Sequence, residues 1–365
     1  MTPTQKAPSD GRTRPHVIAL IPARNEAERI AAAVAGLRSQ TRAPDQIVVV
    51  TNNCTDDNAT YEAARATGVG VLDLHDIKGK KAGALNTALD QVLPTLEDHD
   101  LVLAQDADTV LAPAFVECAA AAMNRRVSAV GGVFHGEPGG GLLGQLQRME
   151  YQRYARDIAR KKDRAVVLSG TATLFRVRVL REIKDARTAG RLGGGTSYYS
   201  LASLTEDDEI TKAVKTMGYQ TMSPAACSVT TEVMTTIPAL WNQRLRWQRG
   251  ALENLRDYGW TKVTAPYFLS QLMMGLGALA LTLYLVLVIL QLVFFGSLGY
   301  SPFWAAIGLI FATERVVSVW RMGWTARLLA GVLVVELAYD LFQQAVYFRA
   351  LFDLALRREE RWVAT

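Results

Sequence analysis

The chain is poor in the residue types that build covalent or metal-held frameworks. Its three cysteines, Cys54, Cys118 and Cys227, lie far apart, and no CxxC pair occurs. Its four histidines form no cluster along the sequence. A disulfide framework and a structural zinc site are therefore not expected, and a reducing, cytosolic compartment suits the chain.

Export signals and nucleic-acid-binding modules are also missing. Residues 1–14 are polar and lack the apolar core of a signal peptide, so we expect a disordered tail there and a cytoplasmic domain after it. The formal net charge is +5, and many arginines flank apolar segments. Lipid headgroups and phosphorylated substrates are the expected anionic partners, and no nucleic acid is expected.

What the chain has instead is a sharp change in composition near residue 260. Residues 15–260 have the composition of an ordinary soluble domain, whereas residues 261–365 are dominated by apolar segments. The segment from Phe268 to Phe295 carries no charge and exceeds the ~20 residues that span a bilayer, which predicts a transmembrane helix. We therefore expect a cytosolic domain followed by a membrane region.

Two further apolar segments leave the number of membrane crossings open. Residues 303–319 are apolar but contain two charged residues, and residues 328–351 contain the polar stripe Glu336, Asp340, Gln343 and Gln344. Polar groups are costly in lipid, so the stripe should face protein, either in this chain or in another subunit.

Basic residues at 321–327 and 357–361 both favour the cytoplasmic side. We prefer two full crossings, near 268–295 and 303–319, with 328–351 re-entrant, interfacial or kinked. Three crossings with an exported tail are the alternative.

The first part of the chain alternates between apolar runs and helical patterns. Strands are predicted at 17–22, 46–51, 69–74 and 100–105, with helices near 26–37, 57–66 and 82–92. Asn25 is expected to cap the first helix. The alternation predicts an α/β fold with a parallel sheet and helices on both faces. A dinucleotide-binding domain is disfavoured, because no GxGxxG follows the first strand.

Two segments allow more than one interpretation. The stretch from Gly136 to Arg164 predicts an amphipathic helix that lies at the membrane surface or lines a substrate site, or else a solvated helix. The glycine-rich stretch from Arg191 to Tyr199 predicts a mobile loop beside a site, or else an ordinary connector.

Polar side chains gather at the predicted carboxyl ends of strands, where parallel sheets bind ligands. In Asp106-Ala107-Asp108, which follows the fourth strand, both carboxylates share one face of an extended segment. Such hard oxygen ligands suit Mg²⁺ or Mn²⁺. A solvated turn is the alternative.

Thr205-Glu206-Asp207 continues into two more acids, Asp208 and Glu209. Repulsion among four adjacent carboxylates tends to raise at least one pKa, which favours a general base. A helix amino terminus is the simpler interpretation, because threonine followed by acids is a good cap, and both can hold together.

Gln243-Arg244-Leu245-Arg246-Trp247 precedes the long apolar run. On a helix, Gln243 and Trp247 share a face with Arg246 beside them. A guanidinium fork suits phosphate and an indole suits a sugar ring. The alternative is a basic helix that binds lipid headgroups, with Arg244 and Arg249 contributing.

These motifs, in this order ahead of an apolar run, resemble the membrane-bound family 2 glycosyltransferases, the group of cellulose, hyaluronan and chitin synthases. The resemblance covers residues 17–249. It implies a GT-A fold with amphipathic interface helices and a carboxy-terminal transmembrane region. It also implies inverting, metal-dependent sugar transfer at the cytoplasmic face of the inner membrane.

The resemblance also implies roles for individual residues. Asp207 is the expected general base, and Asp108 the expected ligand of Mg²⁺ or Mn²⁺. The expected donor-binding residues are Pro22, Ala23, Arg24, Glu26, Asn52, Lys81, Asp106, Gln243 and Arg246. The expected acceptor-binding residues are Ser169, Gly170, Thr171, Glu206 and Trp247. Many relatives have an aspartate in the turn where Asn52 lies, so a UDP-sugar donor is expected with the base preference open.

Three functions fit these motifs. The first is transfer to a saccharide, with processive extension into a β-linked polysaccharide as its fuller form. The second is a single transfer to a polyprenyl phosphate or glycolipid, and the third is a catalytically silent nucleotide-binding scaffold. The membrane helices are fewer than a secretion channel needs, so export would require a homo-oligomer or a partner protein.

Overall fold

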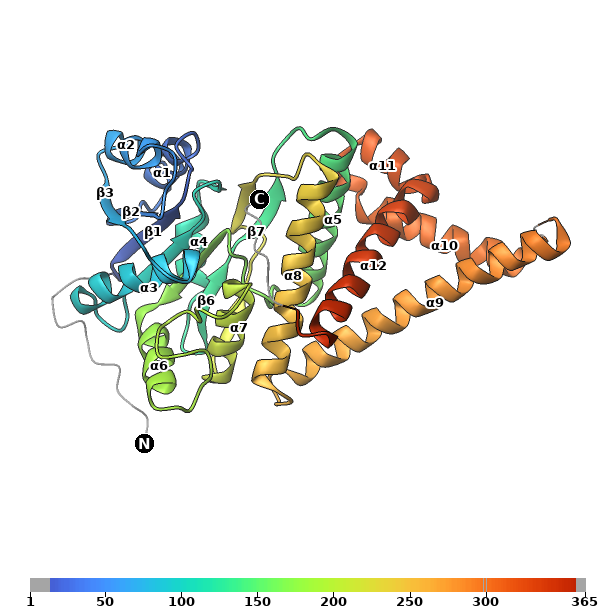
Figure 1. Ribbon diagram of the computed structural model, residues 1–365. Coiled ribbons are helices and arrows are strands. Elements are labelled where there is room, and N and C mark those ends of the chain that lie inside the picture. Colours follow the sequence, from blue (N-terminus) through green and yellow to red (C-terminus); the bar gives the residue numbers. More distant parts are fainter. Residues whose placement is uncertain (1–13, 298, 300, 359–365) are drawn as a thin grey trace. The chain divides into compact units, whose positions relative to one another are not determined.

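The computed structural model describes residues 14–297, 299 and 301–358 (Figure 1). The chain divides into two compact units. Unit 1 comprises Met1–Pro138 and Tyr154–Val233, and unit 2 comprises Gly139–Arg153 and Met234–Thr365. Apart from Arg14, the predicted tail lies outside the described residues, as does the end of the basic segment at 357–361.

Unit 1 contains a seven-stranded sheet with the strand order β3-β2-β1-β4-β8-β6-β9. Its strands are β1 (Val17–Ala23), β2 (Gln46–Asn52), β3 (Gly70–Leu74), β4 (Leu101–Gln105), β6 (Val127–Gly131), β8 (Ala172–Arg176) and β9 (Gln220–Met222). The four strands predicted from the sequence are confirmed as β1 to β4, and they run parallel. β8 runs antiparallel between β4 and β6, so the whole sheet is mixed.

A second sheet in unit 1 has three strands in the order β5-β10-β7. These are β5 (Val110–Leu111), β7 (Val133–Gly136) and β10 (Ser228–Thr231). β5 begins just after Asp108, so the chain leaves the large sheet through the aspartate-containing turn and enters the small one.

Helices cover both faces of the large sheet, as the alternation predicts. Val17, Ala19 and Ile21 share one buried cluster with residues of α1 (Ile30–Arg38), α2 (Ala59–Ala66) and α4 (Phe115–Ala122). Successive strand side chains point to opposite faces, so Ile18 and Leu20 face the other way. That face is covered by α3 (Lys80–Val92), which contacts β1 and β2. Each buried branched side chain contributes roughly 1.5–3 kcal/mol relative to an exposed one.

The first helix begins later than predicted. Asn25 has a left-handed backbone, with φ of 59°, and α1 begins only at Ile30. The Asn25 side chain accepts the Thr55 N–H at 2.8 Å and donates to Thr55 Oγ1 at 3.0 Å. Asn25 therefore joins the loops after β1 and β2, and the expectation that it caps the helix was wrong.

The remaining helices of unit 1 are η1 (Leu93–Thr95), α6 (Val177–Thr188) and α7 (Glu206–Thr216). Unit 2 contains α8 (Ile237–Tyr258), α9 (Ala265–Phe295), α10 (Pro302–Ser318), η2 (Trp320–Met322), α11 (Trp324–Gly331) and α12 (Leu333–Ala355). Helix α5 (Gly141–Arg160) begins in unit 2 and continues into unit 1.

Within the described residues, α9 alone is long and apolar enough to cross a membrane. It has 31 residues, and an 18-residue stretch of it has a mean hydropathy of 2.6. At 1.5 Å per residue it is roughly 46 Å long, against a hydrocarbon core of about 30 Å. α10 has 17 residues and carries two charges, so the expectation of a multi-pass protein is not supported. The third apolar segment is broken at Val332, between α11 and α12.

The polar stripe of α12 faces protein within unit 2, as predicted. Glu336 is 3% exposed, and its carboxylate accepts hydrogen bonds from Arg153 at 2.6 and 2.9 Å and from Arg315 at 2.9 Å. Arg315 also pairs with Asp340 at 2.5 Å, and Gln343 donates to Glu150 at 3.3 Å. The stripe therefore finds partners in its own chain and does not by itself require another subunit.

Helix α5 is more deeply packed than its charge suggests. Gln147, Met149 and Tyr151 are buried, so the interpretation as a solvated helix was wrong for this part. Its charged residues are compatible with burial because they are paired: Glu150 binds Arg244, and Arg153 binds Glu336. Buried charges are tolerated when each has a hydrogen-bonded counter-ion.

Candidate active site

The carboxyl ends of the central strands bring several of the predicted donor-binding residues together in unit 1. Pro22 and Ala23 end β1, and Asn52 ends the neighbouring strand β2. The buried Asn52 amide donates to the Ala23 carbonyl at 3.4 Å, and Arg24 Nε donates to the Asn53 carbonyl at 3.2 Å. Asn52 is thus engaged with the β1 loop. A direct bond to a nucleotide base stays a prediction.

Lys81 is the centre of a polar cluster. Its Nζ lies 2.6 Å from Asp106 Oδ1 and 2.9 Å from Glu206 Oε1, and it donates to the Gly170 carbonyl at 3.0 Å. Burial opposes the charge, but Asp106 and Glu206 outweigh it and raise the Lys81 pKa well above its ordinary value. Lys81 is therefore a permanent cation that joins α3, the end of β4, α7 and the loop before β8.

The backbone before Lys81 depends on a glycine. Gly79 precedes α3 in the left-handed region, with φ of 82°. A Cβ there would lie 2.5 Å from Leu201 Cδ2, which is too close. Glycine supplies the backbone conformation and the space that let α3 begin at Lys80, one residue before Lys81.

Asp207 lies in the first turn of α7 and faces the same cluster. It accepts the Gly170 N–H at 3.1 Å. Burial, reinforced by Glu206 and opposed by Lys81, raises its pKa to about 7. A carboxylate with a pKa near the working pH is suited to general base catalysis.

The physical cause of this raised pKa differs from the sequence argument, which invoked repulsion among four acids. Burial is the larger cause. Three of the four acids have a cationic partner, because Glu206 pairs with Lys81, Asp208 with Lys212 and Glu209 with Arg187. The Glu206 and Asp207 side chains face the polar cluster around Lys81.

Residues 169–171 form a close-fitting loop against this cluster. Ser169 Oγ donates to the Gly132 carbonyl at 2.9 Å, and the Thr171 carbonyl accepts the Asp106 N–H at 2.9 Å. A Cβ on Gly170 would lie 3.2 Å from Lys81 Nζ and 3.3 Å from Asp207 Oδ2. The loop, Lys81, Glu206 and Asp207 line a cavity of about 20 Å³, which is room for one water.

The acids beside the cluster give this part of unit 1 a local excess of negative charge. Burial, and next Asp108, raises the pKa of Glu26 to about 7, and Glu232 adds to the effect. Burial also raises the pKa of Asp106 to about 6, against the pull of Lys81, and raises that of Asp108. Glu232 was not predicted from the sequence, because an isolated glutamate after a short strand carries no motif.

The donor set suits a hard divalent cation that shares its coordination with a substrate. Among the described residues, no group of three or more His, Cys, Asp or Glu side chains is arranged to enclose a metal. Mg²⁺ is commonly held by one or two carboxylates together with substrate phosphates. Asp108 and Asp106 provide carboxylates of that kind, and their raised pKa values show where a cation would be stabilised.

Buried ion pairs anchor the helix that carries Asp207. Arg187 on α6 binds both oxygens of Glu209 at 2.5 and 2.7 Å, and both side chains are almost fully buried. The same guanidinium donates to the carbonyls of Ser197 and Tyr198 at 3.1 and 2.8 Å. Asn86 on α3 in turn exchanges two hydrogen bonds with the Tyr199 backbone. These contacts link the helices of Lys81 and Asp207, and no sequence motif marked them.

The glycine-rich loop is held by the same arginine. Gly194 has φ of 94°, and a Cβ there would lie 3.1 Å from Arg187 Cζ and 3.1 Å from Ser200 Cβ. Gly193 and Gly195 have open space around them. Only Gly194 is therefore required by close packing.

In unit 2, the motif of residues 243–247 lies on α8 and is organised by Arg244. Arg244 is 5% exposed and donates to Gln243 Oε1 at 3.0 Å and to Glu150 Oε2 at 3.0 Å. Its guanidinium lies 4.3 Å from the centre of the Trp247 ring. Sequence reasoning treated Arg244 as incidental, although it orients both Gln243 and Trp247.

The remaining arginines of α8 differ in exposure and pairing. Arg249 pairs with Glu253 at 2.7 Å and donates to a backbone carbonyl of residue 358. With Arg244 and Arg249 both engaged, the alternative of a lipid-binding basic helix loses two of its cations. Arg246 is half-buried, has no ion pair with another described residue, and keeps its guanidinium available.

The structure therefore joins seven of the predicted site residues of unit 1 in one cluster, places Pro22, Ala23, Arg24 and Asn52 at the ends of β1 and β2, and leaves three others in unit 2. Lys81, Asp106, Ser169, Gly170, Thr171, Glu206 and Asp207 share one set of contacts. Glu26 and Asp108 interact electrostatically beside them. Gln243, Arg246 and Trp247 lie on α8, and their predicted contacts with donor and acceptor stay predictions.

The chain is similar to known proteins over most of its length. The family model described as "Glycosyltransferase like family 2" matches residues 15–250. Poly-beta-1,6-N-acetyl-D-glucosamine synthase of Staphylococcus epidermidis is 26% identical over 248 residues, which cover 66% of this chain and 55% of that protein. The synthase of the same name from Staphylococcus aureus strain COL is 25% identical over 279 residues, covering 73% and 62%. The chain thus spans little more than half the length of these curated relatives.

A solved structure shares the fold. A mannosyltransferase from Pyrobaculum calidifontis, in complex with GDP-Man and Mn²⁺, superposes with a TM-score of 0.60 at 20% identity. The match covers 95% of this chain and 88% of that one. The mixed sheet of unit 1 and its covering helices are those of a GT-A fold, as the sequence resemblance implied.

Proposed function

The chain belongs to glycosyltransferase family 2 and is a glycosyltransferase, and we propose that it moves a sugar from a nucleoside diphosphate sugar to a saccharide acceptor with inversion. The observation that carries this proposal is the contact set around Lys81 and Asp207. It places a permanent cation and a carboxylate with a pKa of about 7 around one small cavity.

Each step of the transfer uses a group of this cluster. Asp207 accepts the proton of the acceptor hydroxyl as that oxygen bonds to the anomeric carbon. The bond between the anomeric carbon and the diphosphate breaks at the same time, and the nucleoside diphosphate leaves with the electron pair. One base and no carboxylate nucleophile give direct displacement, which inverts the anomeric centre.

The remaining residues bind and orient the substrates in this proposal. Lys81 holds Asp106, Glu206 and the Gly170 loop in register, which fixes the direction of Asp207. Asp108 would hold Mg²⁺ or Mn²⁺, with Asp106 directed to the donor. When bound, such a cation neutralises the charge that develops on the leaving diphosphate. The GT-A mannosyltransferase of similar fold was solved with Mn²⁺ and a sugar nucleotide, which supports the assignment.

For the substrate, we propose UDP-N-acetylglucosamine and a growing β-linked glycan. The curated relatives are named as poly-beta-1,6-N-acetyl-D-glucosamine synthases, and this supports the choice of sugar. We also propose that α9 anchors the chain in the inner membrane, with unit 1 in the cytoplasm, because α9 is long, apolar and largely exposed. A single transfer to a lipid-linked acceptor is the second candidate, because the described residues contain one helix long enough to span a membrane and an export channel needs several.

A donor panel tests the proposed function. Purified full-length protein in mild detergent is incubated with Mn²⁺ and labelled UDP-N-acetylglucosamine, UDP-glucose or GDP-mannose, and both nucleotide release and product length are measured. We expect turnover with UDP-N-acetylglucosamine and a ladder of products. A one-sugar lipid adduct would support the second candidate, and transfer from none of the donors would overturn the proposal.

Metal removal is expected to abolish turnover. Chelation with EDTA should lower the rate by at least about 10²-fold, since the leaving diphosphate loses its main charge compensation, and Mn²⁺ should restore it. Asp108→Ala should keep the protein folded but raise the Mn²⁺ concentration needed for half-maximal rate. Full activity of Asp108→Ala at ordinary Mn²⁺ would remove Asp108 from the metal site.

Arg244→Lys is expected to lower activity although it preserves the charge. Lysine cannot bond Gln243 and Glu150 in one plane while stacking on Trp247, so both motif residues lose their orientation. We expect a fall in kcat/KM of about tenfold, as for one lost charge-assisted hydrogen bond. Arg256→Lys, at an exposed pair on the same helix, is the control and should leave kcat/KM unchanged.

A further inference from the structure

A pocket at the amino-terminal ends of the parallel strands, opposite the end that carries the catalytic cluster, has no part in the proposed reaction. It has a volume of about 450 Å³ and is lined by residues before β1, after α1, on α4 and at the ends of β4 and β8. Leu101 is the first residue of β4 and is paired with Arg176, the last residue of β8. Asp106 follows the opposite end of β4, so the two sites are separated by the length of that strand.

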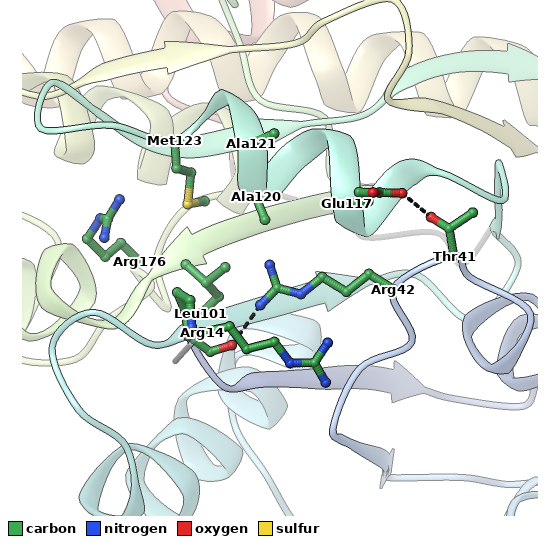
Figure 2. Close-up of a pocket in the computed structure, with 10 residues that line it drawn as sticks. Arg14, Thr41, Arg42, Leu101, Glu117, Ala120, Ala121, Met123 and Arg176 are labelled. Carbon is green, nitrogen blue, oxygen red and sulfur yellow. Dashed lines mark hydrogen bonds between the residues drawn. The ribbon is translucent and has the colours of Figure 1, made fainter. Parts of the chain in front are cut away.

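Three arginines line this pocket against one acid. Arg14, Arg42 and Arg176 contribute guanidinium groups, and Glu117 is the acidic residue in the lining. Glu117 is already engaged, because it accepts the Thr41 hydroxyl at 2.6 Å. Figure 2 shows Arg42 extending through the middle of the pocket with Arg14 beside it, while Arg176 lies on the other side of Leu101.

These arginines are incompletely compensated by the described residues. Arg42 donates one Nη2 bond to the Pro15 carbonyl at 2.7 Å, but its Nε is buried and has no hydrogen-bond partner within the described part of the chain. Arg14 makes one long, exposed contact of 3.3 Å with Asp45. The Arg176 side chain has no hydrogen bond or ion pair with another described residue.

The electrostatics agree with this geometry. Burial, and then the neighbouring Arg14, lowers the pKa of Arg42, although Asp45 and Glu117 pull the other way. Burial also lowers the pKa of Arg176. The fold therefore holds these cations where their charge is unfavourable, and an anion in the pocket would reverse that cost.

The lining also has an apolar part that a bare ion would not need. Leu101, Ala120, Ala121 and Met123 form it, and Met123 lies between Arg176 and Arg42 in Figure 2. The volume lies within the range of pockets that hold small organic ligands. Guanidinium forks match phosphate oxygens, and the apolar surface suits a ring or an alkyl part.

We propose that this pocket is a second ligand site. It binds a small phosphate-bearing molecule at the amino-terminal end of β4, and the catalytic cluster lies at the other end of that strand. The phosphate lies against Arg42 and Arg14, and the organic part covers Leu101 and Met123 towards Arg176. The same chemistry is offered by a soluble phosphomonoester and by an anionic lipid headgroup. The site is independent of the proposed sugar transfer.

Binding to the full-length protein tests this site without any activity measurement. The protein is kept in EDTA, so that a metal-dependent donor site does not take up nucleotide, and is titrated with inorganic phosphate and with AMP by calorimetry. Vesicles of phosphatidylglycerol and phosphatidylcholine are compared with vesicles of phosphatidylcholine alone by flotation. The variants are Arg42→Gln and Arg176→Gln, with the exposed Arg65→Gln on α2 as the control.

We expect AMP to bind the wild-type protein more tightly than inorganic phosphate does. Each pocket variant should weaken AMP binding by about tenfold or more, and Arg65→Gln should match the wild type. The thermal midpoint of the unliganded Arg42→Gln protein should not fall, because a poorly compensated charge is removed. If Arg42→Gln fails to fold, AMP binding by Arg176→Gln decides the test, because the Arg176 side chain has no hydrogen bond or ion pair with a described residue to lose.

The remaining outcomes separate the ligand sources and define failure. Arg42-dependent flotation with phosphatidylglycerol, without AMP or phosphate binding, would identify a lipid headgroup as the source. The proposal would be overturned if the wild-type protein bound neither phosphate nor AMP nor vesicles. It would also be overturned if all of this binding were unchanged in both pocket variants.

Discussion

Replacement of Asp207 with asparagine is expected to abolish most of the sugar transfer while making the protein more stable. Asparagine keeps the size of the side chain and can still accept the Gly170 N–H, but it cannot take the acceptor proton. A positioned general base contributes about 10²–10⁴-fold, so kcat should fall by that factor in a nucleotide-release assay. Asp257→Asn, at an exposed position, is the matched control and should keep full activity.

The pH profile provides a second test of Asp207. Its pKa is raised to about 7, so the base is ionised above pH 7 and protonated below it. In the wild type, kcat/KM should therefore fall by about tenfold per pH unit below 7, since it reports the free enzyme. The residual kcat/KM of Asp207→Asn should not show this fall below pH 7. A wild-type profile that is flat between pH 5 and 8 would contradict the assignment.

The stability gain has a definite dependence on pH. The folded pKa of Asp207 is about 7 and its ordinary value is 3.8, so the native state binds the proton more tightly. Ionised Asp207 thus lowers stability, and this penalty grows from about pH 4 and is complete above pH 7. Asp207→Asn should raise Tm by several degrees above pH 7, at about 2–4 °C per kcal/mol, with little effect near pH 4. A lower Tm for the variant at pH 8 would show that the carboxylate stabilises the fold.

Arg187→Met is expected to have the largest effect on stability. The substitution leaves the Glu209 carboxylate buried without its counter-ion and frees the Ser197 and Tyr198 carbonyls. Removing one partner of a buried pair costs about 3–5 kcal/mol. Thermal unfolding should show a Tm lower by roughly 10 °C or more, and activity should fall with it because α7 carries Asp207.

Two further variants separate the buried pair from a general loss of charge. The double variant Arg187→Met, Glu209→Leu removes both charges and should recover a large part of the lost stability, because no uncompensated charge remains. Arg178→Met on the same helix breaks an exposed pair with Glu182 and should cost less than about 1 kcal/mol. If the double variant were as unstable as the single one, the anchoring would be due to the backbone contacts of Arg187.

Much of the fold follows from local patterns. The apolar runs at β1, β2 and β4 are continuous because these strands are covered on both faces, and such runs are easily read. The start of α1 was misplaced because Asn25 bonds to Thr55, thirty residues away in an adjacent loop, and no local signal reveals such a partner. The antiparallel strand β8 was likewise not predicted, because strand direction depends on the path of the chain between strands.

The candidate site shows the same division. Asp106, Asp108, Glu206 and Asp207 were found because their motifs have fixed spacing. Arg187 and Glu232 were missed, and Arg244 was assigned only to the lipid-binding alternative, since each acts through partners distant in sequence or beside a better-known residue. The pKa of Asp207 could be given a direction from its acidic neighbours, but burial is its main cause, and burial is a property of the packed structure.

The amino-acid sequence is sufficient to predict the family, the α/β order of unit 1, the chemistry of the motif residues and the long apolar segment that forms α9. These depend on residue type and on spacing along the chain, which short-range geometry translates directly into structure. The packed structure is needed to see that Lys81 joins Asp106 to Glu206, that Arg187 anchors the helix of Asp207, and that the polar stripe of α12 pairs with Arg153 and Arg315. Each of these is a meeting of charges from distant segments, and a buried charge is stable only where the fold brings its counter-ion.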